Sequence, residues 1–450
     1  MTEVLKTQLV QGRDTYEAAF EEVGRAAALP DFASGLRDRA FARFSDLGFP
    51  TTKLERWRFT NVTPIAKTPF ILAPPAEVQG STLAPYELPT VSGLRLVFVN
   101  GRYAQDLSVF SDVPAGISIR SLAETLATDP GVVEADLGGL AAFDNDAFTA
   151  MNTALFSDGA VVRVEPNTPI ETPLHLLFLS TAADDGTSVM THPRVLVHAG
   201  ENSQLRVIET YAGPDDARYF TNAVTEIVAG PNAVVDHYKL LRDGLQASHV
   251  ASMHLRLARS ARFSSHSITI GGGFVRNDVD AVLDGEGVEC TLNGLYLANG
   301  RRFVDNHTTI HHAKPHCASH ELYKGILADE ARAVFNGKII VERDAQKTDA
   351  KQTNSALLLS EGSQINTKPE LEIFADDVKC THGATIGQLD KEALFYLRSR
   401  GLSRRQARDV LIHAFASDLL NRITIKPIRD TLDEILQQQL PGSGSGTFHE

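Results

Sequence analysis

From about residue 90 to residue 388 the chain is one short β-rich run after another, with hardly a helical pattern between them. The runs include LRLVFVN, GAVVRVE, LHLLFLS, RVLVHAG, SQLRVIE and FSSHSITI. Side chains alternate within them, as in VECTL, where Val288, Cys290 and Leu292 fall on one face of a strand. The pattern predicts a mainly β core over residues 90–388.

A loose repeat runs through the same region. A small or acidic turn followed by an apolar strand recurs in AGENSQLRV, AGPNAVVDH, ARSARFSSH, DGEGVECTL, ADEARAVFN, SEGSQINTK and ADDVKCTHG. The spacings are irregular, mostly roughly 26 to 44 residues, which is the range expected of solenoids. A β-sandwich would also supply many short strands. About twenty strands in roughly 300 residues, each after a similar turn, favour a parallel β-helix, because there every coil covers the next.

Helical patterns precede this core. Residues 1–62 are expected to form an N-terminal helical region, in which a second helix starts at Asp31 or Ser34 and stops at Gly48. Prolines and glycines then crowd the sequence, and they predict a linker over residues 63–89 rather than a packed element.

Helical patterns also follow the core, and residues 389–440 are predicted to form a C-terminal helical domain. Asp390 and Ser403 are suitable N-caps for two helices, and Pro427 separates the second from a last amphipathic helix. These helices could cap the open end of a solenoid or dock a partner, and both interpretations stay open. Residues 441–450, rich in glycine and serine, are predicted to be a flexible tail.

Charge and composition exclude several classes of protein. The chain has 43 Lys and Arg against 56 Asp and Glu, a net charge of −13, whereas a nucleic-acid partner requires a basic face. Three cysteines without a CxxC motif indicate a reducing compartment rather than a disulfide framework. No signal-peptide pattern is present, and no apolar stretch reaches the ~18 residues needed to span a bilayer. We therefore expect a cytoplasmic protein that binds neither nucleic acid nor membrane.

Side chains that commonly bind metals are densest in HTTIHHAKPHCASHELYKG, which contains His307, His311, His312, His316, Cys317 and His320. Imidazole and thiolate suit zinc, iron or copper, so a metal site is one interpretation. In a strand His307 and His311 share a face, and a third residue such as His316 could join them. No spacing matches a closed tetrahedral site, however. The other interpretation is a set of solvated histidines on turns and outer faces.

A second group lies in FADDVKCTHGATIGQLD, where Cys380 and His382 stand two residues apart and point to the same side of a strand. A thiolate beside an imidazole can bind a soft or borderline metal, or transfer sulfur. By spacing alone, a buried cysteine facing a hydrogen-bonded histidine is the simpler interpretation.

Two carboxylates in the same stretch, Asp376 and Asp377, permit a rival interpretation as a β-helical polysaccharide hydrolase. Adjacent residues of a strand face opposite ways, so these two could address one glycosidic bond only from a turn. Such enzymes also usually act outside the cell. The motifs GxxxxGK[ST], GxSxG and HExxH, which mark other enzyme classes, are missing.

A set of motifs between about residues 290 and 420 resembles a known family. It consists of YKG, FNGKI, AQKTDA, LLLS, TKPELEI, ADDVKCTHGATIG and LFYLRSRG. Together these motifs resemble the SufB/SufD family of iron–sulfur cluster assembly proteins. The segment KLERWRFT near residue 55 is similar to the SufD branch more loosely, and residues 65–280 resemble the family mainly in strand character.

The resemblance implies a right-handed parallel β-helix between the two helical regions. It implies a SufBCD complex, in which residues 389–440 would dock a SufC-like ABC-type ATPase and the strands around 350–385 would face a SufB-like subunit. It also implies a non-catalytic scaffold without a tightly bound cofactor, which shares transient iron or a nascent iron–sulfur cluster with SufB. A homodimer is implied as possible for the isolated chain.

The resemblance also assigns residues. SufB proteins carry an essential cysteine just before an LLIG-like strand, and Asn354 stands at that position in QTNSALLLS. They tend to have glutamate after a shared histidine, where this chain has Gly383. In the SufD branch that strand reads KCxHGAT, and its histidine is implicated in cluster assembly at the SufB interface. The resemblance therefore implies that His382 is an imidazole ligand or proton relay there, and that Cys380 is a secondary, redox-active thiol.

Three alternatives stay open. Within the family, the chain could be a SufB-like, self-associating scaffold, although the amide of Asn354 replaces the thiol that such a scaffold needs. From another class, it could be the polysaccharide-active enzyme, or a plain structural solenoid. Three cysteines are too few for the usual four-thiolate cluster, so the sequence favours a partner that brings the missing thiol.

Overall fold

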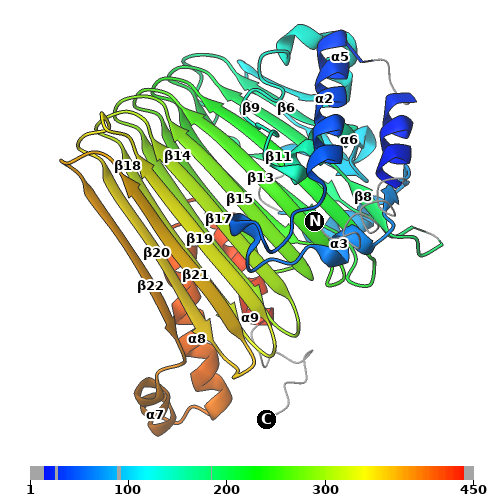
Figure 1. Ribbon diagram of the computed structural model, residues 1–450. Coiled ribbons are helices and arrows are strands. Elements are labelled where there is room, and N and C mark those ends of the chain that lie inside the picture. Colours follow the sequence, from blue (N-terminus) through cyan, green and yellow to red (C-terminus); the bar gives the residue numbers. More distant parts are fainter. Residues whose placement is uncertain (1–14, 26–28, 89–92, 184, 440–450) are drawn as a thin grey trace.

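Consecutive strands of this chain alternate between two sheets and wind into a stack of coils (Figure 1). The computed structural model describes residues 15–25, 29–88, 93–183 and 185–439. Along each sheet the order steps through every second strand, because a strand pairs with those one coil before and one coil after it. The predicted mainly β fold with a parallel β-helix is therefore confirmed, and the β-sandwich is excluded.

Each sheet has 11 strands within the described residues, and we call the two sheets A and B. Sheet A contains β1 (Ile71–Leu72), β5 (Ile117–Ser121), β6 (Gly159–Val164), β8 (Val189–Thr191), β9 (Arg194–Ala199), β11 (Tyr219–Ala229), β13 (Ser248–Leu257), β15 (Phe274–Leu283), β17 (Phe303–His312), β19 (Arg332–Val341) and β21 (Gln364–Ile373). Sheet B contains β2 (Leu94–Val99), β3 (Arg102–Tyr103), β4 (Val109–Phe110), β7 (Leu174–Leu179), β10 (Gln204–Ala212), β12 (Val234–Arg242), β14 (Arg262–Thr269), β16 (Glu289–Ala298), β18 (Ala318–Leu327), β20 (Asp349–Leu358) and β22 (Lys379–Gly387). Strands of successive coils pair in parallel. At the end of the solenoid nearer the N-terminus, which we call the first end, β3, β4 and β5 pair antiparallel with their neighbours.

Parallel pairing aligns residues of successive coils in rows. Ala318 of β18 pairs with Asp349 of β20, so that this coil takes 349 − 318 = 31 residues. Because side chains alternate along a strand, each row points either into the solenoid or out of it. The predicted shared face of Val288, Cys290 and Leu292 is one of the inward ones, and all three residues are buried in the main apolar core.

One column of turns explains the repeat seen in the sequence. Asn167, Asn202 and Asn232 each have a positive φ, between 55° and 60°, and stand one coil apart. Their side chains bond to one another, with Nδ2 to Oδ1 distances of 2.9 Å. Their backbone N–H groups also donate to the next coil. Asparagine tolerates this left-handed conformation better than most residues, and its amide satisfies the stacked turns.

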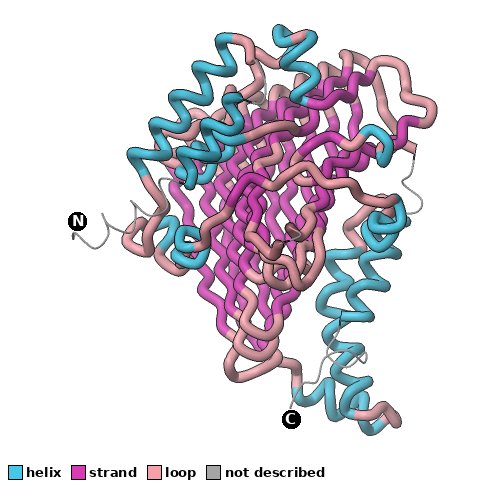
Figure 2. Tube along the Cα trace, turned by 90° about the vertical axis from the view of Figure 1, so that its right-hand side faces the viewer, coloured by secondary structure: helices cyan, strands magenta, loops and turns pink. Residues whose placement is uncertain are grey.

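The N-terminal helices cover the outer face of sheet A (Figure 2). Residues 15–25 are helical, and α2 (Asp31–Leu47) follows and packs on α6 (Ala147–Leu155). Helix α2 starts at Asp31 and stops before Gly48, its C-cap, whose φ is 62°, as the sequence predicts.

Residues 63–88 are packed, which corrects the prediction of a linker over 63–89. They contain α3 (Thr63–Lys67) and α4 (Gly80–Leu83), and β1 joins sheet A by pairing with β8. Ile65 and Leu83 are each 1 % exposed and Phe70 is 2 % exposed. The prolines prevent long regular elements here, but the apolar side chains between them still reach the core.

The predicted β core over residues 90–388 also contains helices, which is a second correction. Helix α5 (Leu122–Thr128) begins at Ser121, whose side chain accepts a bond from the Glu124 N–H, and α6 begins at Asp146 in the same way. Regular coils therefore start only near β6, and α6 packs on the outer face of sheet A beside β11 and β13.

The C-terminal helices are α7 (Lys391–Ser399), α8 (Arg404–Leu420) and α9 (Lys426–Gln439). The Asp390 side chain accepts bonds from two N–H groups of α7, and Ser403 forms a capping box with Gln406 at the start of α8. Both predicted N-caps are thus confirmed. Pro427 lies in the first turn of α9, and the predicted tail over 441–450 lies outside the described residues.

Helices α8 and α9 lie on the outer face of sheet B, on the opposite side from the N-terminal helices (Figure 2). Their buried residues Leu419, Ile428 and Leu432 pack with residues of that face such as Ile268 and Leu295. They therefore do not cap the open end of the solenoid, and α7 projects beyond the coils (Figure 1). Among the described residues no helix has both the length and the apolar character that a membrane crossing requires.

Candidate functional site

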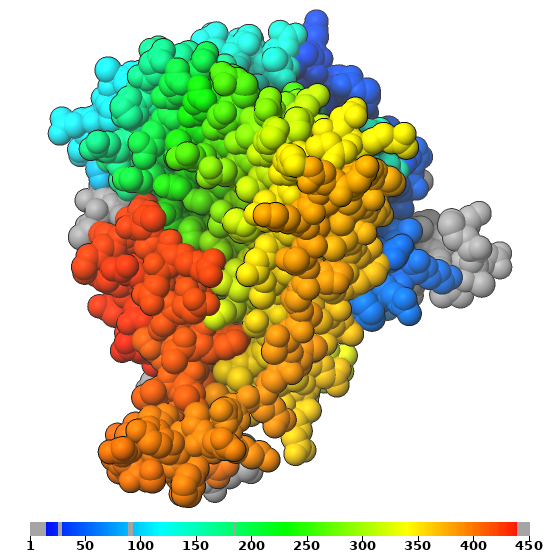
Figure 3. All heavy atoms as spheres, turned by 90° about the vertical axis from the view of Figure 1, so that its left-hand side faces the viewer, coloured from blue at the N-terminus to red at the C-terminus, as the bar shows by residue number. Residues whose placement is uncertain are grey.

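The last coil leaves one end of the solenoid open (Figure 3). Among the described strands β21 pairs only with β19, and β22 only with β20, so both present an unpaired edge. Ile373 is 39 % exposed, Phe374 58 % and Ile386 48 %. Unpaired backbone groups beside apolar side chains can pair with another sheet, so this end is the first candidate surface for a partner.

Cys380 and His382 both lie on β22 at this open end. Cys380 pairs with Ala350 and His382 with Gln352, so both belong to rows that point into the solenoid one coil earlier. The thiol is half-buried against a cluster that includes Ile339 and Ala350, whereas His382 is exposed. The predicted shared face of the two residues is present, and both stand where a partner would cover them.

Burial raises the pKa of the Cys380 thiol above its ordinary value, and the Asp349 carboxylate adds to this rise, against a lowering by a backbone hydrogen bond with Ala350. The thiolate is the nucleophilic and metal-binding form of cysteine. In the free chain the surroundings of Cys380 therefore favour its thiol form, which is less reactive than the thiolate.

Two buried polar residues stand directly behind His382. Gln352 is 1 % exposed and Glu321, one coil further in, is 3 % exposed. Gln352 Nε2 donates to Glu321 Oε2 over 2.6 Å. Burial raises the pKa of Glu321 to about 7, against the hydrogen bond from Gln352, which lowers it.

The pair of Glu321 and Gln352 was not predicted from the sequence. In ASHELYKGIL, strand alternation puts Glu321 on one face with Ser319 and Tyr323, and both of these are buried. That alternation was the available signal, since a carboxylate in a buried row is rare without a partner.

Asn354, which the resemblance puts at the position of the SufB-type cysteine, lies two residues further along β20. It is 1 % exposed, and its Nδ2 donates to Thr367 Oγ1 over 3.0 Å. An amide bridging the interior is thus found where the resemblance would require a thiol for a SufB-like scaffold.

The histidine-rich segment does not gather into one site. His307 and His311 point outward from sheet A, as predicted for a shared face, while His316 is in a turn with a φ of 60°. Four residues along a strand span about 13 Å, too far for two imidazoles to bind one ion from a flat face. His312 faces the interior and bonds Ser319, and His320 is exposed on sheet B.

Each of the three proposed histidine ligands already has an acidic neighbour. Nitrogen-to-oxygen distances are 3.0 Å from His307 to Asp305, 2.8 Å from His311 to Glu342 and 3.9 Å from His316 to Glu286. No group of three or more His, Cys, Asp or Glu side chains in the described part of the chain is arranged to hold a metal ion.

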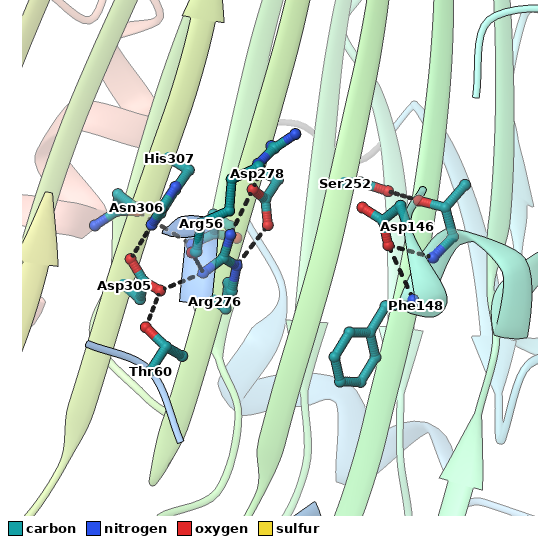
Figure 4. Close-up of polar contacts among 12 residues, drawn as sticks. Arg56, Thr60, Asp146, Phe148, Ser252, Arg276, Asp278, Asp305, Asn306 and His307 are labelled. Carbon is teal, nitrogen blue, oxygen red and sulfur yellow. Dashed lines mark hydrogen bonds and ion pairs between the residues drawn. The ribbon is translucent and has the colours of Figure 1, made fainter. Parts of the chain in front are cut away.

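His307 belongs to a buried charged cluster under the N-terminal segment (Figure 4). Arg276, fully buried, pairs with Asp278 and with Asp305, each over 2.7 Å. Its guanidinium lies 3.8 Å from the ring centre of Trp57. These contacts tie the segment around Trp57 to the outer face of sheet A, so the cluster has a structural role.

A cavity of about 350 Å³ lies beside this cluster, and His307 and Lys368 contribute to its lining. Lys368 Nζ is 2.6 Å from Glu55 and 3.0 Å from Glu370. Lys368 is thus paired with two carboxylates and His307 with one.

The two carboxylates of the hydrolase interpretation lie in the turn before β22. Asp376 and Asp377 are both exposed, and Asp377 pairs with Lys347. An exposed turn provides no cleft in which two carboxylates could flank a glycosidic bond.

A second exposed surface lies on the C-terminal helices. Phe395 and Tyr396 of α7 are 74 % and 56 % exposed, and Val410 of α8 is 45 % exposed. Large apolar side chains gathered on a projecting helix are typical of an interaction site.

Two family models match the chain. One, described as the SufBD core domain of SUF system FeS cluster assembly, matches residues 178–415. The other, described as the SufBD protein N-terminal region, matches residues 13–176. The boundary between them falls close to where the regular coils begin.

Several curated proteins are similar over most of the chain. An iron–sulfur cluster assembly SufBD family protein of Synechocystis is 35 % identical over 404 residues, covering 88 % of each chain. The iron–sulfur cluster assembly protein SufD of Escherichia coli is 33 % identical over 399 residues, covering 88 % of this chain and 90 % of its own. The protein of the same name from Bacillus subtilis is 28 % identical over 306 residues, covering 66 % of this chain and 68 % of its own.

Proposed function

This chain belongs to the SufB/SufD family of iron–sulfur cluster assembly proteins, and from that membership we propose that it is the SufD-like scaffold subunit of a SufBCD complex. It would pair with a SufB-like subunit through β21 and β22 and bind a SufC-like ATPase through its C-terminal helices. It would have no catalytic activity of its own.

The position of His382 carries the proposal. An exposed imidazole stands on the unpaired edge strand, with the half-buried Cys380 two residues before it. A second sheet added to this edge would enclose both side chains between the two subunits. An imidazole and a thiol inside a closed interface can hold iron, whereas in water each is a weak single ligand.

The shortage of thiols supports a shared site. Of the three cysteines, Cys290 and Cys317 are buried inside this chain, and only Cys380 is near the surface. Asn354 supplies no thiol at the position where the SufB branch has one. The SufB-like partner would therefore accept the sulfur, and this chain would contribute His382 as an imidazole ligand or proton relay. Iron or the nascent cluster is the cargo of the site, and no cofactor would stay tightly bound.

Helices α7 and α8 offer the surface for the ATPase. The exposed Phe395, Tyr396 and Val410 belong to these helices and not to the unpaired edges of β21 and β22, so both partners could bind at once. A rearrangement driven by ATP hydrolysis could then reach the open end through α8, which packs on β16 and β18.

The test is cluster formation on the complex reconstituted with His382→Ala. We expect loss of bound iron and of the cluster absorption, with the complex still intact by size-exclusion chromatography. His320→Ala is the matched control, because His320 is also exposed but points outward from sheet B. Unchanged cluster formation in an intact His382→Ala complex would refute the assignment of this site.

Loading of the isolated chain with sulfur and iron tests the SufB-like alternative. A self-sufficient scaffold would load both alone. A chain that loads neither without a SufB-like subunit supports the proposal.

A further inference from the structure

One inward-pointing row of sheet B leads through the solenoid to His382 at the open end. From coil to coil its residues in register are His237, Ser265, Leu292, Glu321, Gln352 and His382. Leu292 shows that an apolar side chain fits this row, since it is 1 % exposed within the main core. The two coils behind His382 nevertheless carry a carboxyl and an amide.

This polar pair is costly for the fold. A buried carboxyl and amide lose their hydration, and their mutual hydrogen bond restores only part of it. Apolar residues of similar volume are often as stabilising or more so at such positions. Stability therefore does not explain why Glu321 and Gln352 lie there, whereas their place behind His382 does.

The geometry of the pair leaves one atom unused. Gln352 Nε2 is engaged by Glu321, and its Oε1 is buried without a hydrogen-bond partner among the described residues. The amide fits because Gly337 faces it, where an added Cβ would lie 2.1 Å from Nε2. His382 is the next residue of the row, in the adjacent strand about 4.8 Å away.

We propose that Gln352, held by Glu321, is a positioning residue that accepts a hydrogen bond from His382 and so decides which ring nitrogen keeps its proton. The inner ring nitrogen donates to Gln352 Oε1, and the outer nitrogen keeps its lone pair for a metal ion. Orientation of a ligating histidine through its second nitrogen is a general feature of metal sites. This inference rests on the proposed function, because it gives His382 its ligand form.

Glu321 fixes the direction of the amide. An ionised carboxylate only accepts hydrogen bonds, so Gln352 must turn Nε2 toward it and Oε1 away from it. The other titratable groups near Glu321 are Cys290 and Tyr323, and both are kept protonated because burial, and secondarily the Glu321 charge, raise their pKa values. Burial raises the pKa of Glu321 to about 7, so its carboxyl is ionised at pH 8. Of these three groups, Glu321 therefore supplies the charge that acts on the Gln352 amide from the interior side.

The test is the tautomer of His382, read from ¹⁵N-histidine NMR of the full chain at pH 8, with the signal assigned by its loss in His382→Gln. Removing one hydrogen bond of about 1 kcal/mol changes an equilibrium by about fivefold. We expect one tautomer of His382 to dominate in the wild type. In Gln352→Leu the ratio of this tautomer to the other should fall about fivefold. The matched control is Asn354→Leu, which removes a buried amide two residues away, in register with Ala384 instead of His382.

If Gln352→Leu does not fold, the double variant Glu321→Leu/Gln352→Leu replaces the whole polar pair with apolar side chains and gives the same readout. Equal tautomer ratios in the wild type and in a folded Gln352 variant would overturn the inference. The proposed function fails differently: His382→Ala would then leave cluster formation intact, whatever the NMR shows.

Discussion

Glu321→Gln should make the stability of this protein less dependent on pH. Its carboxyl is buried, and burial raises its pKa from the ordinary 4.5 to about 7. The folded state thus holds this proton more tightly than the unfolded state does. The stability that the neutral carboxyl contributes is fully present below pH 4.5 and is lost as the pH rises through about 7. Glutamine has nearly the same shape and does not titrate, so the variant keeps its stability over this range.

The size of the effect follows from the shift. At about 1.4 kcal/mol per pKa unit, a rise from 4.5 to about 7 corresponds to about 3 kcal/mol. For a chain of 450 residues this is about 3 °C in melting temperature, since the entropy of unfolding is about 2 cal/mol/K per residue.

The assay is the melting temperature of Glu321→Gln minus that of the wild type at several pH values from 5 to 8. Taking the difference removes the titration of all other groups. We expect it to increase by about 3 °C from the lowest to the highest pH. Glu361→Gln, in an exposed turn after β20, is the control and should give a flat line. A flat line for Glu321→Gln as well would show that Glu321 does not titrate as a buried group and would refute the reasoning.

Two further predictions concern the buried cluster around Arg276 and the exposed aromatic residues of α7. Arg276→Met should cost about 3 to 5 kcal/mol, because it leaves buried carboxylates unpaired. It should also free the segment around Trp57 for limited proteolysis, while Arg301→Met, at an exposed ion pair, leaves melting and cleavage unchanged. The double variant Phe395→Asp/Tyr396→Asp should abolish pull-down of the SufC-like ATPase without lowering the melting temperature. Phe374→Asp at the open end is the control and should still retain the ATPase. Equal retention of the ATPase by both variants would contradict the assignment of α7.

The strands and their parallel winding could be predicted from the sequence because a solenoid repeats the same unit of turn and strand in every coil. Each coil needs a turn, and residues such as Asn202 and Asn232 adopt the left-handed conformation that the turn requires. Helix starts at Asp390 and Ser403 were equally readable, since a cap is a local contact between neighbours in sequence.

Features that depend on distant contacts were not predicted. The segment from residue 63 to 88 looks like a linker because its prolines exclude long elements, yet Phe70 is buried by residues far along the chain such as Phe220. The strand alternation around Glu321 could predict that its carboxyl is buried, but not its register with Gln352 and His382 in the next two coils. The histidine-rich segment does not gather into one metal site, and the reason is the opposite one. Its histidines are close in sequence, but strand alternation and a turn point their side chains in different directions.

The difference between the two ends of the solenoid limits how many subunits can join. At the first end the strand edges are short and antiparallel, with β3 and β4 only two residues long, and they offer little to a second sheet. At the other end β21 and β22 present ten and nine residues of unpaired edge. A solenoid with two such edges could stack head to tail into a fibre, as open-ended β arrays tend to do. With one such edge among the described strands, one joint would use the unpaired end of each partner, and growth would stop at a pair.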